Sequence, residues 1–185
     1  MIREVDDDPA LARALAEMLI DGFRDVAPHA WPEMAAATAE VRASLEPERI
    51  SLVAIDDDGG PVGWIGGITT YHGHVMELHP LVVRAGARGK GIGRALVAEL
   101  ERRSADRGVG TITVGTDDEM GMTSLGGADL FPDPLRHLAS IRDLKGHPFG
   151  FYLAVGFSLT GVLPDANGFG KPDIFLSKRV AKVRA

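Results

Sequence analysis

The sequence comprises 185 residues with a formal net charge of −6, and it contains no cysteine. This length is typical of one domain with a substantial core, so a single domain over residues 1–185 is expected. The lack of thiols excludes a disulfide framework, a cysteine nucleophile and a cysteine-ligated zinc site. The negative charge argues against nucleic acid and anionic membranes as partners, and it is compatible with a cationic small molecule.

The N-terminal residues lack the features of a targeting segment. Residues 1–8 are acidic, without the basic start and apolar core of a signal peptide. No apolar run approaches the roughly 20 residues that are needed to cross a bilayer. We therefore expect a cytoplasmic protein.

The first third of the chain predicts a short strand and two helices. Residues 2–5 form the strand pattern, and Asp8 and Pro9 are the N-cap and first position of a helix. A second helical pattern begins at residues 31–33. The apolar stripes of the two helices consist of Leu11, Leu15, Met18 and Leu19 in the first and of Met34, Val41 and Leu45 in the second.

Three strand patterns follow. The apolar runs 50–55 and 62–71 flank an acidic, glycine-ending turn, which predicts a hairpin. The third strand, 75–83, contains Pro80. Because proline cannot donate to a β-ladder, we expect the sheet to open locally at this position.

The remaining patterns mix helices and strands without regular alternation. A helix is expected from residue 92, with an amphipathic stretch to residue 103 and an end near residues 107–108, and residues 117–146 predict an irregular region. The other expected elements are a strand at 111–115, short helices at 135–144 and 147–152, and strands at 157–163 and 174–176. This order favours the α/β class in the broad sense (α+β), with a mixed sheet rather than a doubly wound one.

A glycine-rich turn, Arg88-Gly-Lys-Gly-Ile-Gly93, connects the third strand of this group to the helix at 92. The first N–H groups of a helix lack intrahelical partners, and the helix dipole favours negative charge there. Glycine lets the backbone approach an anion closely, while Arg88 and Lys90 add positive charge. The turn is therefore suited to a pyrophosphate, although a connection without any ligand is the alternative.

The spacing of the glycines selects among anion-binding families. They alternate strictly, which fails the dinucleotide pattern G-x-G-x-x-G, and Lys90 is followed by glycine rather than by the Ser or Thr of a Walker loop. The turn resembles the acetyl-CoA loop of the Gcn5-related N-acetyltransferases (GNAT). This resemblance implies a GNAT fold, with strands that splay near the acetyl-CoA site.

The strand before the loop carries groups that are suited to proton transfer. A period of two places Glu77, His79 and Leu81 on one face. Acylation of an amine requires a base, because an alkylammonium must lose a proton before its nitrogen attacks. The alternative is a solvent-facing glutamate and histidine on a half-buried strand.

Three further polar or aromatic features of the sequence each allow more than one interpretation. Tyr152 precedes Gly-Phe by four residues, where the GNAT superfamily often has its general acid, and the alternative is a core aromatic. His72 and His74 have a chelating spacing, but without a third ligand a polar hairpin turn is favoured. The acidic run 116–119 could hold a cation, face solvent or anchor backbone amides.

Several longer blocks resemble the aminoglycoside 6′-N-acetyltransferases, and in particular their chromosomally encoded dimeric subgroup. The blocks are Met76-Glu-Leu-His-Pro-Leu-Val-Val83, Gly115-Thr-Asp-Asp118, the segment 161–174, Pro47-Glu-Arg-Ile50 and His147-Pro-Phe-Gly-Phe-Tyr152. The resemblance extends from about residue 47 to residue 179. It implies transfer of an acetyl group from acetyl-CoA to a cationic aminoglycoside, without a metal, by a homodimer.

The same resemblance implies roles for individual residues. Glu77 would be the general base, Tyr152 the general acid, and His79 would line the same pocket. The residues expected to bind acetyl-CoA are Leu81, Val82, Val83, Arg88, Gly89, Lys90, Gly91, Ile92, Gly93 and Arg94. The residues expected to contact the aminoglycoside are Phe23, Trp31, Tyr71, Glu77, Asp117 and Glu119.

Two other functions fit the same residues. The first is a GNAT acetyltransferase whose acceptor is a polyamine, another amino sugar or a protein amine. The second is a non-catalytic acyl-CoA-binding module, against which the presence of both Glu77 and Tyr152 argues.

Overall fold

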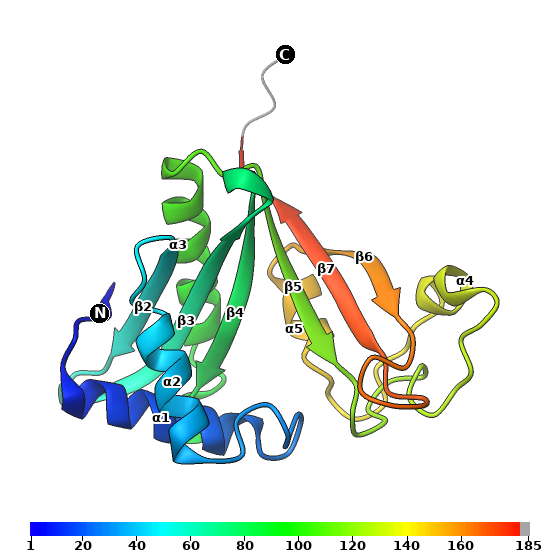
Figure 1. Ribbon diagram of the computed structural model, residues 1–185, viewed down its shortest axis with the longest axis horizontal. Helices are drawn as coiled ribbons and strands as arrows, with labels where there is room; N and C mark the ends of the chain where they lie inside the picture. Colours follow the sequence, from blue (N-terminus) through cyan, green and yellow to red (C-terminus); the bar gives the residue numbers. More distant parts are fainter. Residues whose placement is uncertain (182–185) are drawn as a thin grey trace. The chain divides into compact units, whose positions relative to one another are not determined.

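The computed structural model describes residues 1–181, which form two compact units (Figure 1). The first unit comprises residues 1–24, 28–112 and 179–181, and the second comprises residues 25–27 and 113–178. The expectation of one domain over residues 1–185 stays a prediction. Among the described residues, no helix is both long and apolar enough to cross a membrane.

The first unit is built on four antiparallel strands that follow one another in chain order. They are β1 (Ile2–Glu4), β2 (Arg49–Ile55), β3 (Pro61–Thr70) and β4 (Val75–Val83). The predicted hairpin of β2 and β3 is confirmed. Its turn is closed by the Asp56 carboxylate, which accepts hydrogen bonds from the N–H groups of Asp58 and Gly60.

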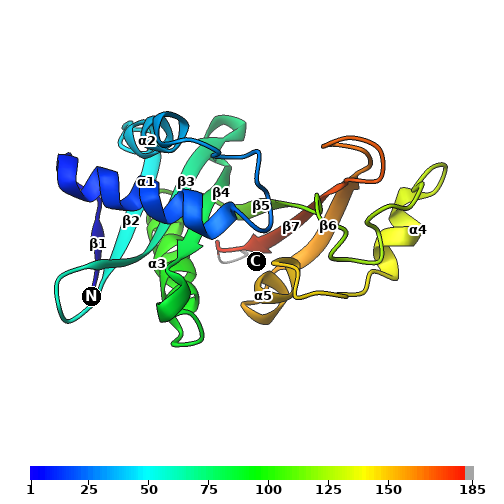
Figure 2. The same cartoon turned by 90° about the horizontal axis from the view of Figure 1, so that it is seen from below.

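Helices cover both faces of these strands. Figure 2 shows α1 (Pro9–Phe23) and α2 (Met34–Ala43) on one face and α3 (Ile92–Asp106) on the other. Asp8 caps α1 as predicted, because its carboxylate accepts the N–H of Ala10. The core between the strands and the first two helices includes Leu15, Leu19, Val41, Val53, Trp64 and Val82.

A β-bulge interrupts β4 at the predicted position of Pro80. Ile65 of β3 pairs with Leu81 and Gly67 pairs with Leu78, so two residues of β4, His79 and Pro80, lie opposite Gly66. The two backbones approach closely there, and a Cβ atom on residue 66 would collide with the carbonyl group of His79. Only glycine allows this close approach without displacing the backbone.

The bulge corrects the predicted face of Leu81. His79 contacts Glu40 of α2, so His79 and Glu77 face the α1 and α2 side. Val82 packs against Gly22 of α1 and therefore lies on that side too. An extra residue in one strand reverses the alternation of side chains beyond it. Leu81 thus lies on the opposite face from Glu77, contrary to the period-two prediction.

The second unit contains most of β5 (Thr111–Asp117), followed by α4 (Pro134–Ala139), α5 (Phe149–Ala154), β6 (Ser158–Leu163) and β7 (Asp173–Arg179). Its strands are ordered β5, β7, β6, and β6 pairs with β7 in the antiparallel sense. Helix α4 is shorter than predicted and β7 is longer. The irregular order of helices and strands confirms the predicted α/β class.

Candidate active site

The glycine-rich turn has the backbone geometry of an anion site. A short 3₁₀ turn (Ala85–Ala87) precedes it, and Gly89 and Gly91 adopt φ angles of +76° and +82°. Gly91 is the N-cap of α3, and no side chain caps the first N–H groups of this helix. A Cβ at position 91 would meet no atom within 4 Å, so the space in front of these N–H groups is open. The turn therefore fits a pyrophosphate.

The basic side chains around the turn are arranged differently from one another. Arg88 folds back onto the end of β4, where its Nε donates to the carbonyl oxygen of Val83 at 3.0 Å. Lys90 is exposed within the turn, and Arg94 is exposed on the first turn of α3. The positive charge of Lys90 and Arg94 thus lies beside the N–H groups that an anion would use.

The backbone of β4 presents N–H groups at the edge that does not pair with β3. The N–H of Arg84 donates to the carbonyl of Val62 at 2.9 Å. Hydrogen-bonded and non-hydrogen-bonded residues alternate along an antiparallel ladder, so Val82 also bonds to β3. The N–H groups of Leu81 and Val83 consequently point toward the opposite edge, where they are suited to bind carbonyl oxygens of an extended ligand.

A cluster of aromatic and acidic side chains lies over the face of β4 that carries Glu77. The rings of Phe23 and Trp31 are in edge contact with centroids 4.7 Å apart, and Trp31 contacts the imidazole of His79 at 5.4 Å. The structure therefore brings together Phe23, Trp31 and His79, whose contact with an acceptor stays a prediction. Glu77 is half-buried on the same face.

Glu40 of α2 belongs to this cluster and was missed by the sequence analysis. Its carboxylate lies 3.6 Å from Nε2 of His79 and 3.0 Å from Nη1 of Arg49. The contact with His79 and the neighbouring Arg49 lower the pKa of Glu40, although burial acts in the opposite direction. The only local signal was an acidic residue on the mostly apolar second helix, which is also typical of a solvated face.

Tyr71, unlike Phe23 and Trp31, is largely exposed. It lies in the 3₁₀ turn (Tyr71–Gly73) between β3 and β4 and is 76 % exposed. His72 belongs to the same turn, which fits the prediction of a polar hairpin turn. Among the described residues, no group of three or more histidine, cysteine, aspartate or glutamate side chains could hold a metal ion. The predicted contact of Tyr71 with a substrate stays a prediction.

Tyr152 lies on α5 in the second unit and is 7 % exposed. Its ring makes edge contacts with those of Phe151 and Phe157, at 5.3 and 5.6 Å between centroids. Burial raises the pKa of its phenol, so the hydroxyl group is protonated at neutral pH. The group can therefore act as a hydrogen-bond or proton donor.

The acidic run at the end of β5 is divided between different roles. Asp118 is 1 % exposed and accepts hydrogen bonds from the N–H groups of Met122 and Thr123 and from the Thr123 hydroxyl. It anchors backbone amides, which was one of the predicted alternatives. Asp117 accepts a hydrogen bond from the side-chain amide of Asn167. Glu119, which follows Asp118 in the chain, is half-buried.

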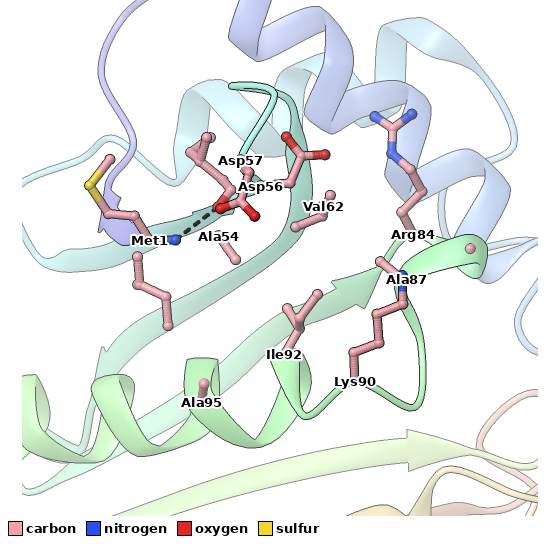
Figure 3. A pocket seen from close by; sticks show the side chains of 13 residues that line it. Met1, Ala54, Asp56, Asp57, Val62, Arg84, Ala87, Lys90, Ile92 and Ala95 are labelled. Carbon is pink, nitrogen blue, oxygen red and sulfur yellow. Dashed lines mark hydrogen bonds between the residues drawn. The ribbon is translucent and has the colours of Figure 1, made fainter.

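A pocket of about 750 Å³ lies beside the glycine-rich turn (Figure 3). Lys90 and Arg84 line it on the side of the turn, and Asp56 and Asp57 line it from the β2–β3 hairpin. The carboxylates disfavour a phosphate group there. The uncapped N-terminus of α3 is therefore the better anion site of the two.

Comparison with known proteins agrees with this geometry. The model of the acetyltransferase (GNAT) family matches residues 12–125, so the chain belongs to this family. No curated protein sequence gives a significant match. The chain is thus an acetyl-CoA-dependent acetyltransferase, with acetyl-CoA as co-substrate, and the predicted GNAT fold is confirmed.

Three solved structures that are similar to this chain are all aminoglycoside 6′-acetyltransferases. An aminoglycoside 6′-N-acetyltransferase complexed with coenzyme A is 38% identical with a TM-score of 0.91, and the aminoglycoside 6′-N-acetyltransferase from Enterococcus faecium is 39% identical with a TM-score of 0.88. An aminoglycoside 6′-acetyltransferase type Ii is 34% identical with a TM-score of 0.75. Each match covers 100% of this chain and 99% of the other.

Proposed function

We propose that this enzyme acetylates the 6′-amino group of aminoglycosides. The observation that carries the proposal is the cluster on one face of β4, where Glu77 and His79 lie with Trp31 and Glu40. Carboxylates and an aromatic ring are suited to a cationic sugar, because they combine charge attraction with cation–π contact. The full-length similarity to enzymes that act on aminoglycosides supports the same acceptor.

The proposed chemistry is direct acyl transfer. Glu77 takes a proton from the acceptor ammonium, through water, and the free amine attacks the thioester carbon. The N–H groups of Leu81 and Val83 donate to the thioester oxygen as negative charge develops on it. As the carbon–nitrogen bond forms and the carbon–sulfur bond breaks, the attacking nitrogen loses its second proton and the departing thiolate takes up a proton through water, so that the amide and free CoA are the products.

Tyr152 has a proton available for the departing thiolate. Because burial raises the pKa of its phenol, full proton transfer from Tyr152 is demanding. A hydrogen bond from the neutral phenol to the sulfur instead stabilises the negative charge as it develops there, before the thiolate takes up its proton. The turn at residues 88–94 binds the pyrophosphate, and such positioning supplies much of the rate.

The test is the release of free CoA thiol by the purified enzyme with two aminoglycosides that differ only in a 6′-amine or a 6′-hydroxyl. We expect turnover with the 6′-amino compound alone. Equal turnover with both compounds would assign the reaction to another amino group. No turnover with either compound, together with turnover on a polyamine, another amino sugar or a peptide amine, would replace the aminoglycoside by that acceptor.

A further inference from the structure

Glu40 lies at a position that links a structural ion pair to the proposed acceptor site. It is on α2, its side chain is 17 % exposed, and one of its oxygens, Oε1, accepts a hydrogen bond from Nη1 of Arg49 at 3.0 Å. Arg49 is the first residue of β2 and is itself mostly buried. Because the guanidinium holds Oε1, the second oxygen, Oε2, is directed to His79, at 3.6 Å from its Nε2.

The carboxylate of Glu40 remains charged in this half-buried place. The contact with His79 lowers the pKa of Glu40 most, Arg49 lowers it further, and desolvation opposes both. The distance of 3.6 Å is longer than a hydrogen bond and within the range of an ion-pair contact. Glu40 therefore presents a full negative charge to one edge of the imidazole.

The indole of Trp31 also contacts the His79 ring. The two rings are 5.4 Å apart between centroids at an interplanar angle of 50°, and Phe23 supports Trp31 in an edge contact. A carboxylate beside Nε2 favours the tautomer that carries its proton on Nε2. In the neutral imidazole, this tautomer leaves Nδ1 of His79 with its lone pair, as a hydrogen-bond acceptor.

We propose that Glu40 is a positioning residue that acts through His79. It holds the imidazole against Trp31 with the proton on Nε2, so that Nδ1 accepts a hydrogen bond from the ammonium of the acceptor beside Glu77. This inference rests on the proposed acceptor site and deepens it. It gives a role to a charged carboxylate between a helix and a strand, where an apolar side chain could join them.

The competing explanation is that Glu40 only ties α2 to β2 through Arg49. Glu46 provides a matched control, because its carboxylate also contacts Arg49, at 3.7 Å, and its side chain is 64% exposed. The structure shows no contact of Glu46 with His79. Glu40 and Glu46 are thus both partners of Arg49, but only Glu40 also contacts the imidazole of His79. Glu40→Gln and Glu46→Gln make the same chemical change at these two positions.

The first experiment is a double-mutant cycle with Glu40→Gln and His79→Ala, measured with the 6′-amino aminoglycoside. We expect Glu40→Gln to lower kcat/KM for the amine about tenfold, with the KM for acetyl-CoA unchanged. In the His79→Ala background the same substitution should have no further effect, because its route of action is gone. A loss of equal size in that background, or an equal loss in Glu46→Gln, would overturn the inference.

The second experiment needs no acceptor and therefore separates the two proposals. An imidazole in contact with an indole changes its fluorescence lifetime, and a Trp31→Phe blank isolates the signal of Trp31 from that of buried Trp64. We expect Glu40→Gln to change the Trp31 lifetime when His79 is present and not in His79→Ala. No change, or a change independent of His79, would refute the role of Glu40. Inactivity of the wild-type enzyme on the 6′-amine, with the lifetime coupling intact, would refute the acceptor alone.

Discussion

At the scale of single residues, the proposed active site depends on where each polar side chain finds its partners. Glu77 and His79 lie on the same face of β4, and His79 is held by contacts from α2 and from the segment before it. The carboxylate of Asp118, by contrast, fixes the loop after β5 by accepting hydrogen bonds from Met122 and Thr123. Residues of equal chemical type thus have different tasks because their surroundings differ.

Glu77→Gln should lower kcat by at least a hundredfold, since the amide cannot accept the proton of the acceptor ammonium. Binding of acetyl-CoA should be nearly unchanged, because the turn at residues 88–94 and the backbone of β4 are not altered. Stopped-time assays of thiol release and calorimetric titration with CoA would measure the two quantities. Turnover at the wild-type rate at neutral pH would remove Glu77 from the mechanism.

The sequence pointed to many residues of the proposed site but not to Glu40. The strand pattern and the loop selected Glu77, His79 and residues 88–94, because strand, turn and helix are adjacent in the chain. Glu40 could not be found in this way. Its contact with His79 joins positions 39 residues apart, and only the packing of α2 on the strands creates that contact.

At the scale of secondary-structure elements, the bulge in β4 determines which groups face the proposed acceptor site. Two residues of β4 lie opposite Gly66, and beyond them the alternation of side chains is reversed. Glu77 and His79 therefore precede the reversal, while the N–H groups of Leu81 and Val83 follow it. In the proposed site, β4 consequently provides side chains before the bulge and backbone N–H donors after it.

Gly66→Ala should disrupt this arrangement, because the new methyl group would collide with the carbonyl of His79, a backbone atom that cannot turn away. We expect a loss of about 1–3 kcal/mol in the free energy of unfolding, measured with urea, and reduced turnover. Gly63→Ala in the same strand is the control. Its methyl group would meet the flexible ends of Leu96 and Ile92 at 2.9 and 3.0 Å, so a smaller loss is expected. Equal losses would show that the bulge has no special need for glycine.

The glycine-rich turn illustrates what local sequence can predict about an element. Its glycines, the strand before it and the helix after it are contiguous in the chain, and Gly89 and Gly91 adopt positive φ angles in the structure. The bulge was predictable only in part. Pro80 marked a break in the ladder, but its effect on the faces of Leu81 and Val82 depends on the pairing with β3.

At the scale of the whole molecule, acidic residues contribute to stability as well as to charge. In α3, the carboxylate of Glu99 contacts the guanidinium groups of Arg102 at 2.7 Å and of Arg103 at 2.8 Å. Arg103 in turn pairs with Glu4 of β1. These contacts, first with Arg102 and then with Arg103, lower the pKa of Glu99 from 4.5 to about 2.

The stability of the protein should therefore depend on Glu99 in a defined pH range. A lowered pKa in the folded state means that the favourable contribution is complete above pH 4.5 and is lost as the pH falls toward 2. Glu99→Gln should lower the free energy of unfolding at pH 7 by less than about 1 kcal/mol, since these pairs are partly screened by water. Thermal unfolding at several pH values would show the difference between variant and wild type narrowing on acidification. A difference that stays constant with pH would assign the effect of the substitution to side-chain shape instead of charge. At pH 7, 1 M salt should reduce the difference in stability between variant and wild type.

The predicted homodimer and the predicted cytoplasmic location also concern the whole molecule, and both stay predictions. Sedimentation of the purified enzyme would measure the first.

Acetyl-CoA as the ligand and Tyr152 as the acid were implied by the family resemblance. Local patterns in the chain were sufficient for the order of helices and strands, the anion-binding character of the glycine-rich turn and the candidate base Glu77. Each of these features is encoded by residues within one or two elements, through hydrophobic periodicity, glycine conformations and helix capping. The approach of Glu40 to His79, the reversal of faces at the bulge and the burial of Asp118 arose only in three dimensions. They depend on strand register and on helix packing, which many distant residues determine together.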